Sequence, residues 1–105
     1  MNKSKIAKLK AAGFAVGNAE DFLALTPEEA GYVQLRLSLA KTLHNYRVKS
    51  HLTQAAFAKR VHSSQSRVAK MEAGDASVSV DLMIRSMMAL GATTKDIGRA
   101  MMRAA

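Results

Sequence analysis

The spacing of apolar residues along the chain predicts helices, and the longest of them covers Pro27 to about Ser50. Its start is marked by Thr26, which can cap the helix, by the proline that suits the first helical position, and by Glu29, which completes a capping box. The apolar residues that follow recur three and four positions apart, on an arc wider than a single core contact needs. One stripe of this arc comprises Tyr32, Leu35, Leu39, Leu43 and Tyr46, and the other comprises Val33, Leu37, Ala40 and Val48.

Two arginines, Arg36 and Arg47, fall between these apolar stripes, which is an unusual place for charge. A long cationic side chain at such a position usually buries its stem and extends its charged head into water. We therefore expect snorkelling for Arg36, and a second interpretation for Arg47 is given below.

The stretch from Leu52 to Gly74 predicts two short helices joined by a tight turn. The first begins after Thr53, whose hydroxyl can accept a free backbone N–H, and runs to about Arg60. The second begins at Ser63 or Ser64, again a residue type that caps well. It ends before the closing glycine, the residue type that best suits the left-handed conformation past a helix end.

The second of these helices has two different faces. Val68 and Met71 lie on one side, which is expected to pack in the core. The opposite arc is small, polar and cationic, with no acidic group, and its members can bond bases or phosphates: Gln suits adenine, Ser suits either, and Lys suits guanine or phosphate. The alternative interpretation is a solvated helix face with no ligand. This arc consists of Gln65, Ser66, Ala69, Lys70 and Ala73.

Two more helices follow a polar link from Asp75 to Ser79. Ser79 is expected to cap a helix over about Val80 to Leu90, and Thr93 or Thr94 a last helix from Lys95 to about Arg103. The residues expected to close the core are Leu82, Met83, Ile84, Met87 and Leu90. The apolar residues on one side of the last helix are Ile97, Ala100 and Met101.

Four of the seven methionines fall in the pairs Met87-Met88 and Met101-Met102. Methionine fills irregular gaps well, so one interpretation is core packing. The other is an adaptable self-association surface built from the last two helices.

The charge is strongly basic, with 16 Lys and Arg against 8 Asp and Glu and a net charge of +8 in 105 residues. Half of these bases, with a single acid, lie between Tyr32 and Glu72, the segment that contains the cationic helix face. Such a balance favours an anionic partner, nucleic acid first. The length suits one small domain.

Several other classes of function find no support in the sequence. There is no cysteine, which excludes disulfides and thiolate metal sites. His44, His51 and His62 have no histidine partner at helical spacing, and no phosphate-binding loop, paired carboxylate motif or nucleophile elbow occurs. We expect no metal, no cofactor and no enzyme activity. No apolar run approaches the roughly 18 residues that span a bilayer, and no secretory signal is evident, so we expect a cytoplasmic protein.

The stretch from Leu52 to Gly74 resembles the helix-turn-helix of the phage-repressor-like, or XRE, family of bacterial and phage regulators. The resemblance implies an all-α, phage-repressor-like DNA-binding domain of five to six helices. His62 departs from the family, which usually has Gly in this turn, and a positive φ at His costs about 1 kcal/mol. The matching residues are Leu52, Thr53, Gln54, Phe57, Ala58, Val61, Ser64, Gln65, Ser66, Val68, Glu72 and Gly74.

The same resemblance assigns roles to individual residues. It implies that Gln54 bonds a phosphate and braces Gln65. It also implies an ion pair between Arg47 on the long helix and Glu72 near the end of the reading helix. We expect this pair to be a largely buried, bidentate bridge that fixes one helix against the other. Together with the face described above, the candidates are Gln65, Ser66 and Lys70 for base reading and Gln54, Ser64 and Arg67 for phosphate binding.

The chain is expected to divide into two parts. Residues 1–25 form a basic N-terminal arm and a short helical segment, and residues 26–105 form the helix-turn-helix DNA-binding domain with its C-terminal helices. The arm either follows DNA into a groove or is a frayed terminus. The wide apolar arc of the long helix can take part of the N-terminal segment or a second subunit.

We therefore predict a sequence-specific regulator of double-stranded DNA that acts as a homodimeric repressor. The alternative is the antitoxin of a toxin–antitoxin pair, in which the acidic segment Glu20 to Glu29 meets a basic toxin protein and the chain represses its own operon. A third possibility is non-specific nucleic-acid binding through charge alone, which predicts a steep salt dependence without sequence preference.

Overall fold

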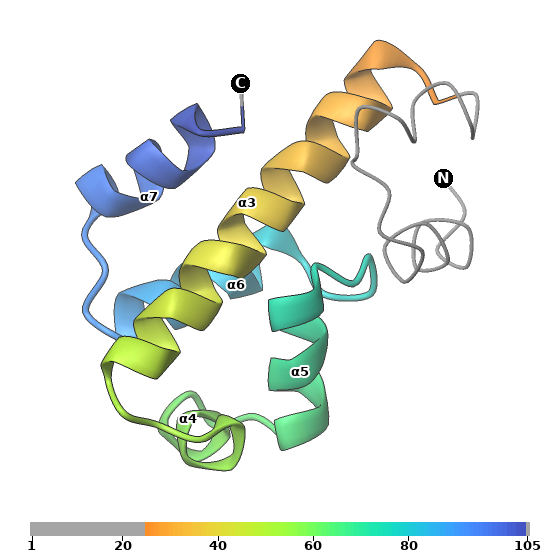
Figure 1. The fold of residues 1–105 in the computed structure, drawn as a ribbon. Helices are drawn as coiled ribbons and strands as arrows, with labels where there is room; N and C mark the ends of the chain where they lie inside the picture. The colour runs from red at the N-terminus through yellow and green to blue at the C-terminus, as the bar shows by residue number, and fades with distance from the viewer. Residues whose placement is uncertain (1–24, 105) are drawn as a thin grey trace.

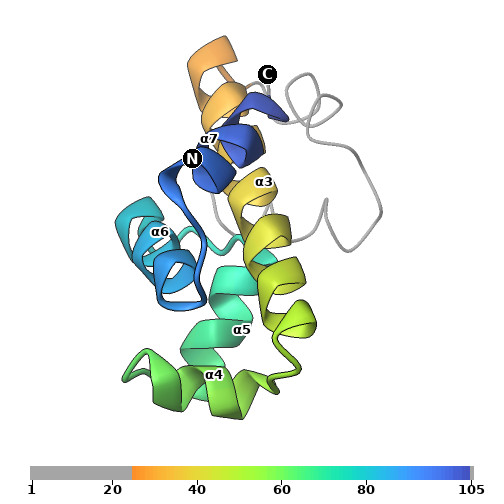
Figure 2. The same cartoon turned by 90° about the vertical axis from the view of Figure 1, so that its left-hand side faces the viewer.

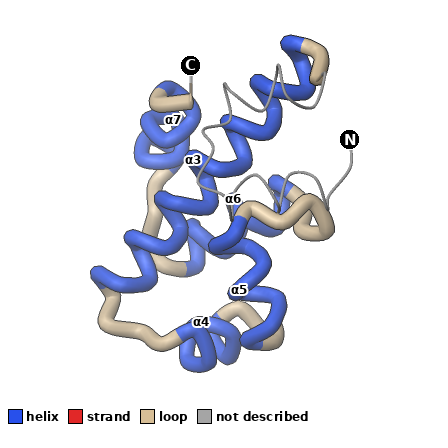
Figure 3. The backbone as a smooth tube through the Cα atoms, turned by 45° about the vertical axis from the view of Figure 1, so that its right-hand side comes forward, coloured by secondary structure: helices blue, strands red, loops and turns tan. Residues whose placement is uncertain are grey.

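A computed structural model describes residues 25–104, and these residues form five α-helices and no strand (Figures 1 and 3). The all-α prediction is confirmed. The predictions for the basic arm and for the short helical segment lie outside the described residues, apart from Leu25. The helices are α3 (Pro27–Lys49), α4 (Gln54–Arg60), α5 (Gln65–Ala73), α6 (Val80–Ala89) and α7 (Thr94–Met102).

Each helix begins at a capping residue that the sequence had indicated. In α3, Thr26 accepts a hydrogen bond from the backbone N–H of Glu29, whose side chain bonds back to complete the capping box. The sequence allowed Ser63 or Ser64 to cap one helix and Thr93 or Thr94 to cap another. The caps are Ser64 and Thr93. The residues at the N-caps are Thr26, Thr53, Ser64, Ser79 and Thr93.

The long helix α3 forms the centre of the domain, because α5, α6 and α7 all pack against it (Figures 1 and 2). In Figure 1, α7 lies on one side of α3, and α4 and α5 lie on the other. The core between them contains side chains from all five helices. Its largest fully buried members are Phe57, Leu39, Leu43, Met71, Met83, Met87, Val68 and Val78.

The apolar arc of α3 is wider than the surface its neighbours cover. Tyr32 and Val48, which the sequence assigned to the two stripes, are exposed. They lie towards the two ends of the helix, where fewer elements pack. The methionine pairs are divided: Met87 is fully buried and Met101 packs against the core, whereas Met88 and Met102 are exposed.

The expectation that Arg36 extends its head into water is wrong. The residue is only 4% exposed. Its guanidinium lies against the loop between α5 and α6, where it donates to the backbone carbonyls of Asp75 and Val78. The loop offers acceptors that sequence spacing did not reveal, and these replace water as the partners of the charged head.

Candidate nucleic-acid interface

The helix-turn-helix consists of α4, a tight turn and α5. His62 adopts a φ of 55° in this turn. It stands where the XRE family usually has glycine, and the resemblance therefore implied a positive φ. The backbone N–H of the next residue, Ser63, donates to the carbonyl of Ala58 at 2.8 Å and closes the turn. Phe57 and Ala58 of α4 are buried in one cluster with Val68 of α5, so the two helices meet through apolar contacts.

The two faces of α5 are those predicted from the sequence. Val68 and Met71 are completely buried against α3 and α4. The end of the helix is closed by Gly74, which has a φ of 68°, and by a hydrogen bond from the N–H of Asp75 to the carbonyl of Lys70. The exposed side chains of the opposite face are Gln65, Ser66, Arg67, Ala69, Lys70 and Ala73.

The phosphate candidates occupy different environments. Ser64 is exposed and accepts a hydrogen bond from the N–H of Arg67 at 3.1 Å, so its hydroxyl hydrogen is left for another acceptor. Gln54 is half-buried, and its amide nitrogen donates to the carboxylate of Glu72 at 3.3 Å. The expected bracing of Gln65 by this residue is not among the contacts of the described residues; the contact that Gln54 makes is with the carboxylate of Glu72.

A groove of about 300 Å³ lies between α5 and the loop that follows it. It brings Ser77, which the sequence analysis had placed in an uninterpreted polar link, to the edge of the reading helix. The backbone N–H of Ser77 donates to the side chain of Asp75 at 2.8 Å. An Asp side chain often bonds the backbone two residues further on, so this aspartate was the signal in the sequence for a turn here. The groove is lined by Ser64, Arg67, Lys70, Ser77 and Val78.

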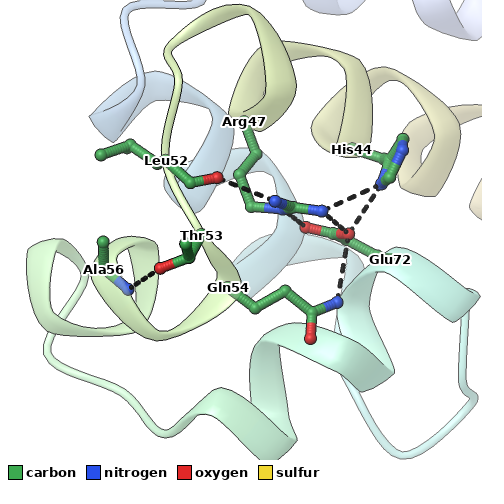
Figure 4. A network of polar contacts seen from close by, with 7 residues as sticks. All are labelled: His44, Arg47, Leu52, Thr53, Gln54, Ala56 and Glu72. Carbon is green, nitrogen blue, oxygen red and sulfur yellow. Dashed lines mark hydrogen bonds and ion pairs between the residues drawn. The ribbon is translucent and has the colours of Figure 1, made fainter.

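Glu72 anchors the C-terminal end of α5 to two other helices (Figure 4). Its carboxylate receives two hydrogen bonds from Arg47 of α3: Nε donates to Oε2 at 2.5 Å and Nη2 donates to Oε1 at 3.0 Å. The side chains are 13% exposed for Arg47 and 7% exposed for Glu72. The two residues therefore form a largely buried, bidentate ion pair.

His44 joins this pair, although the sequence analysis gave it no role. Its Nδ1 lies 2.8 Å from Oε1 of Glu72. It precedes Arg47 by three residues, so both side chains project from the same face of α3, and this helical spacing is the signal that could have found it. Nη1 of Arg47 also donates to the carbonyl of Leu52 at 2.8 Å, which fixes the link from α3 to α4.

The network sets the charge of its two principal members. Burial alone would raise the pKa of Glu72, but the hydrogen bonds from Arg47, His44 and Gln54 outweigh it and hold that pKa below the ordinary value. The hydrogen bond to Glu72 raises the pKa of Arg47 despite its partial burial. Both groups are therefore charged at neutral pH.

The positive charge available to a ligand is smaller than the sequence count implied. Of the eight bases between Tyr32 and Glu72, Arg36 is buried and Arg47 is engaged with its carboxylate. Lys41 and Lys49 line grooves beside α7, which lies on the other side of α3 from α5 (Figure 1). The exposed cations that belong to the helix-turn-helix itself are Lys59, Arg60, Arg67 and Lys70.

Residues 25–104 contain no group of three or more side chains suited to hold a metal ion. None of the helices in this part of the chain combines the length and the apolar character needed to cross a bilayer.

Comparison with known proteins supports the interpretation of the motif. No curated protein and no solved structure matches the chain. The sequence pattern of a family described as "Helix-turn-helix domain" matches residues 38–99, from the middle of α3 into α7. This match covers more than half of the chain, includes all of α4, α5 and α6, and agrees with the XRE-like resemblance. The protein belongs to the helix-turn-helix domain family, whose fold indicates a DNA-binding regulator.

Proposed function

We propose that this protein binds double-stranded DNA sequence-specifically and that α5 is the helix that enters the major groove. The observation that carries the proposal is the composition of the open face of α5. Gln65, Ser66 and Lys70 are exposed there, the short Ala69 lies among them, and no acidic side chain faces outward from the helix. A duplex can approach such a face closely and meet donors and acceptors suited to base edges.

The remaining candidates bind the DNA backbone. Ser64 and Arg67 line the groove at the start of α5, where a hydroxyl and a guanidinium can both bond phosphate oxygens. The amide nitrogen of Gln54 uses one hydrogen for Glu72, and the other remains for a phosphate. These contacts set the register of the protein and leave the reading of sequence to the open face of α5.

The protein acts as a homodimeric repressor in this proposal. Two copies place their reading helices in successive major grooves, about 34–36 Å apart, on a site with two-fold symmetry. A dimer bound to its operator represses transcription by occupying that site.

The test is selection of bound sites from a random duplex library near physiological salt, with the molecular mass of the protein measured in parallel. A two-fold-symmetric consensus with half-sites about 10 base pairs apart is the expected result. A variant with both Gln65→Ala and Lys70→Ala is the matched control, since it should fold normally and lose the consensus. Binding without any enriched sequence would refute specific reading and favour non-specific binding through charge.

A second function, that of an antitoxin, keeps the same DNA contact and adds a toxin protein as partner. It is favoured by the acidic segment Glu20 to Glu29, which precedes the basic helix-turn-helix. Glu28 of this segment is exposed at the start of α3. Co-expression with the product of the adjacent reading frame tests it. A stable complex with that product, together with relief of its toxicity, would support the antitoxin role, and independent behaviour of the two would oppose it.

A further inference from the structure

Arg36 is a buried cation without a carboxylate partner in the described part of the chain. Its Nη2 donates to the carbonyl of Asp75 at 2.5 Å and to that of Val78, which are 39 and 42 residues further along the chain. Its Nη1 lies 3.4 Å from the hydroxyl of Tyr32, and its guanidinium carbon lies 5.8 Å from the centre of that ring. Nε is buried with no hydrogen-bond partner. Burial of a charge on neutral acceptors is costly, so a specific role for this residue is worth seeking.

The carbonyls that Arg36 holds belong to the loop between α5 and α6. This loop is already a tight turn, because the N–H of Val78 donates to the carbonyl of Asp75 at 3.1 Å and that of Ser77 donates to the Asp75 side chain. Arg36 ties the turn to α3 at two points. A shift of the whole turn relative to α3 would therefore break both hydrogen bonds from Arg36.

The same loop forms one wall of the groove beside the reading helix. Ser77 is exposed in that wall, and it shares the groove with Ser64, the N-cap of α5, and with Arg67 and Lys70 of the helix itself. Val78 connects Arg36 to the groove: its carbonyl accepts a hydrogen bond from Arg36, and the same residue lines the groove. The position of the wall relative to α5 thus depends on a side chain that does not itself reach the groove.

We propose that Arg36 is a positioning residue for DNA binding: it fixes the Asp75–Val78 loop so that Ser77 bonds a backbone phosphate held in the groove beside Arg67. The inference rests on the proposed function and deepens it, by adding a phosphate contact and the buried group that sets its place. Arg36 precedes residues 38–99, the part of the chain matched by the family, whereas the loop that it holds lies within them.

Arg36→Met is the test variant, because it removes both loop bonds and keeps an unbranched side chain in the core. Arg85→Gln is its matched control: it also removes one positive charge, but Arg85 is exposed on α6 and does not line the groove. Each protein is titrated with a mixed-sequence duplex at several salt concentrations, and its folding is checked by circular dichroism. Arg36→Met should bind roughly tenfold or more below the control, the loss expected for a missing charge-assisted hydrogen bond. The slope of log K against log salt should stay near the wild-type value, because the lost contact is made by a neutral serine hydroxyl and releases no counterion.

Equal affinity for Arg36→Met and Arg85→Gln would overturn the inference and leave the proposed function standing. Failure of the wild-type protein to bind any duplex would overturn both. If Arg36→Met does not fold, Ser77→Ala decides the matter, because it alters only an exposed side chain. It should melt like the wild type and bind roughly tenfold more weakly with an unchanged salt slope, and wild-type affinity of this variant would refute the phosphate contact.

Discussion

The substitution Glu72→Gln tests the joint that holds the reading helix in place. It keeps the shape of the side chain and removes its charge. The carboxylate now accepts two hydrogen bonds from Arg47, one from Gln54 and a contact from His44 (Figure 4). A glutamine presents an N–H₂ group to one of these donors, and it leaves the guanidinium of Arg47 without a counter-charge.

The cost can be worked from the burial of the pair. With 7% and 13% of the two side chains exposed, water can compensate little of what is lost. Each charge-assisted hydrogen bond from Arg47 contributes about 1.5–3 kcal/mol, and breaking one partner of a buried ion pair costs about 3–5 kcal/mol. For a domain of this size, 1 kcal/mol shifts the melting temperature by about 4–8 °C, so we expect a fall of at least about 12 °C.

The assay is thermal and urea unfolding followed by circular dichroism at neutral pH. The control is Arg85→Gln, which breaks an ion pair with Asp81 whose side chains are 75% and 72% exposed. This change should alter the free energy of unfolding by less than about 1 kcal/mol. If Glu72→Gln melts within a degree or two of the wild type, then the ion pair does not stabilise the fold to the extent that its geometry implies.

Three further outcomes are expected. Lys70→Ala should relax the preference for one base position in site selection, whereas Arg67→Ala should weaken binding to all sequences alike and lower the salt slope by about 1. His62→Gly should leave the melting temperature unchanged or raise it, while His62→Val should lower stability by at least about 1 kcal/mol, because a β-branched residue suits the φ of 55° poorly. The lowered pKa of Glu72 means that its contribution is complete above the ordinary value of 4.5 and is lost as the pH falls through its folded-state pKa. Acid melting series should therefore show the gap between wild type and Glu72→Gln narrowing below about pH 4.5.

The helix boundaries were predictable because their causes are local. Thr53, Ser64 and Ser79 each accept from an N–H three residues further on, a contact fixed by sequence distance alone. Gly74 likewise ends α5 through its own backbone conformation. The two faces of α5 follow from helical periodicity, and for that reason the buried and exposed positions could be assigned without knowledge of the partner helices.

The contacts that were not predicted connect distant parts of the chain. The acceptors of Arg36 are backbone carbonyls in a loop, and a carbonyl carries no sequence signal because every residue has one. Gln54 turned to Glu72 because folding brings a buried carboxylate to it. The left-handed conformation of His51, with a φ of 57°, was missed because nothing beside that residue marks the sharp turn between α3 and α4.

The residues that hold α5 in place are distinct from those on its open face. Val68, Met71 and Glu72 fix the helix to its neighbours, whereas the side chains of Gln65 and Lys70 make no hydrogen bond within residues 25–104. Substitutions on the open face therefore escape selection for folding. A lineage can exchange one target sequence for another by single steps, without passing through unstable intermediates, and a protein engineer can randomise the same positions on an unchanged scaffold.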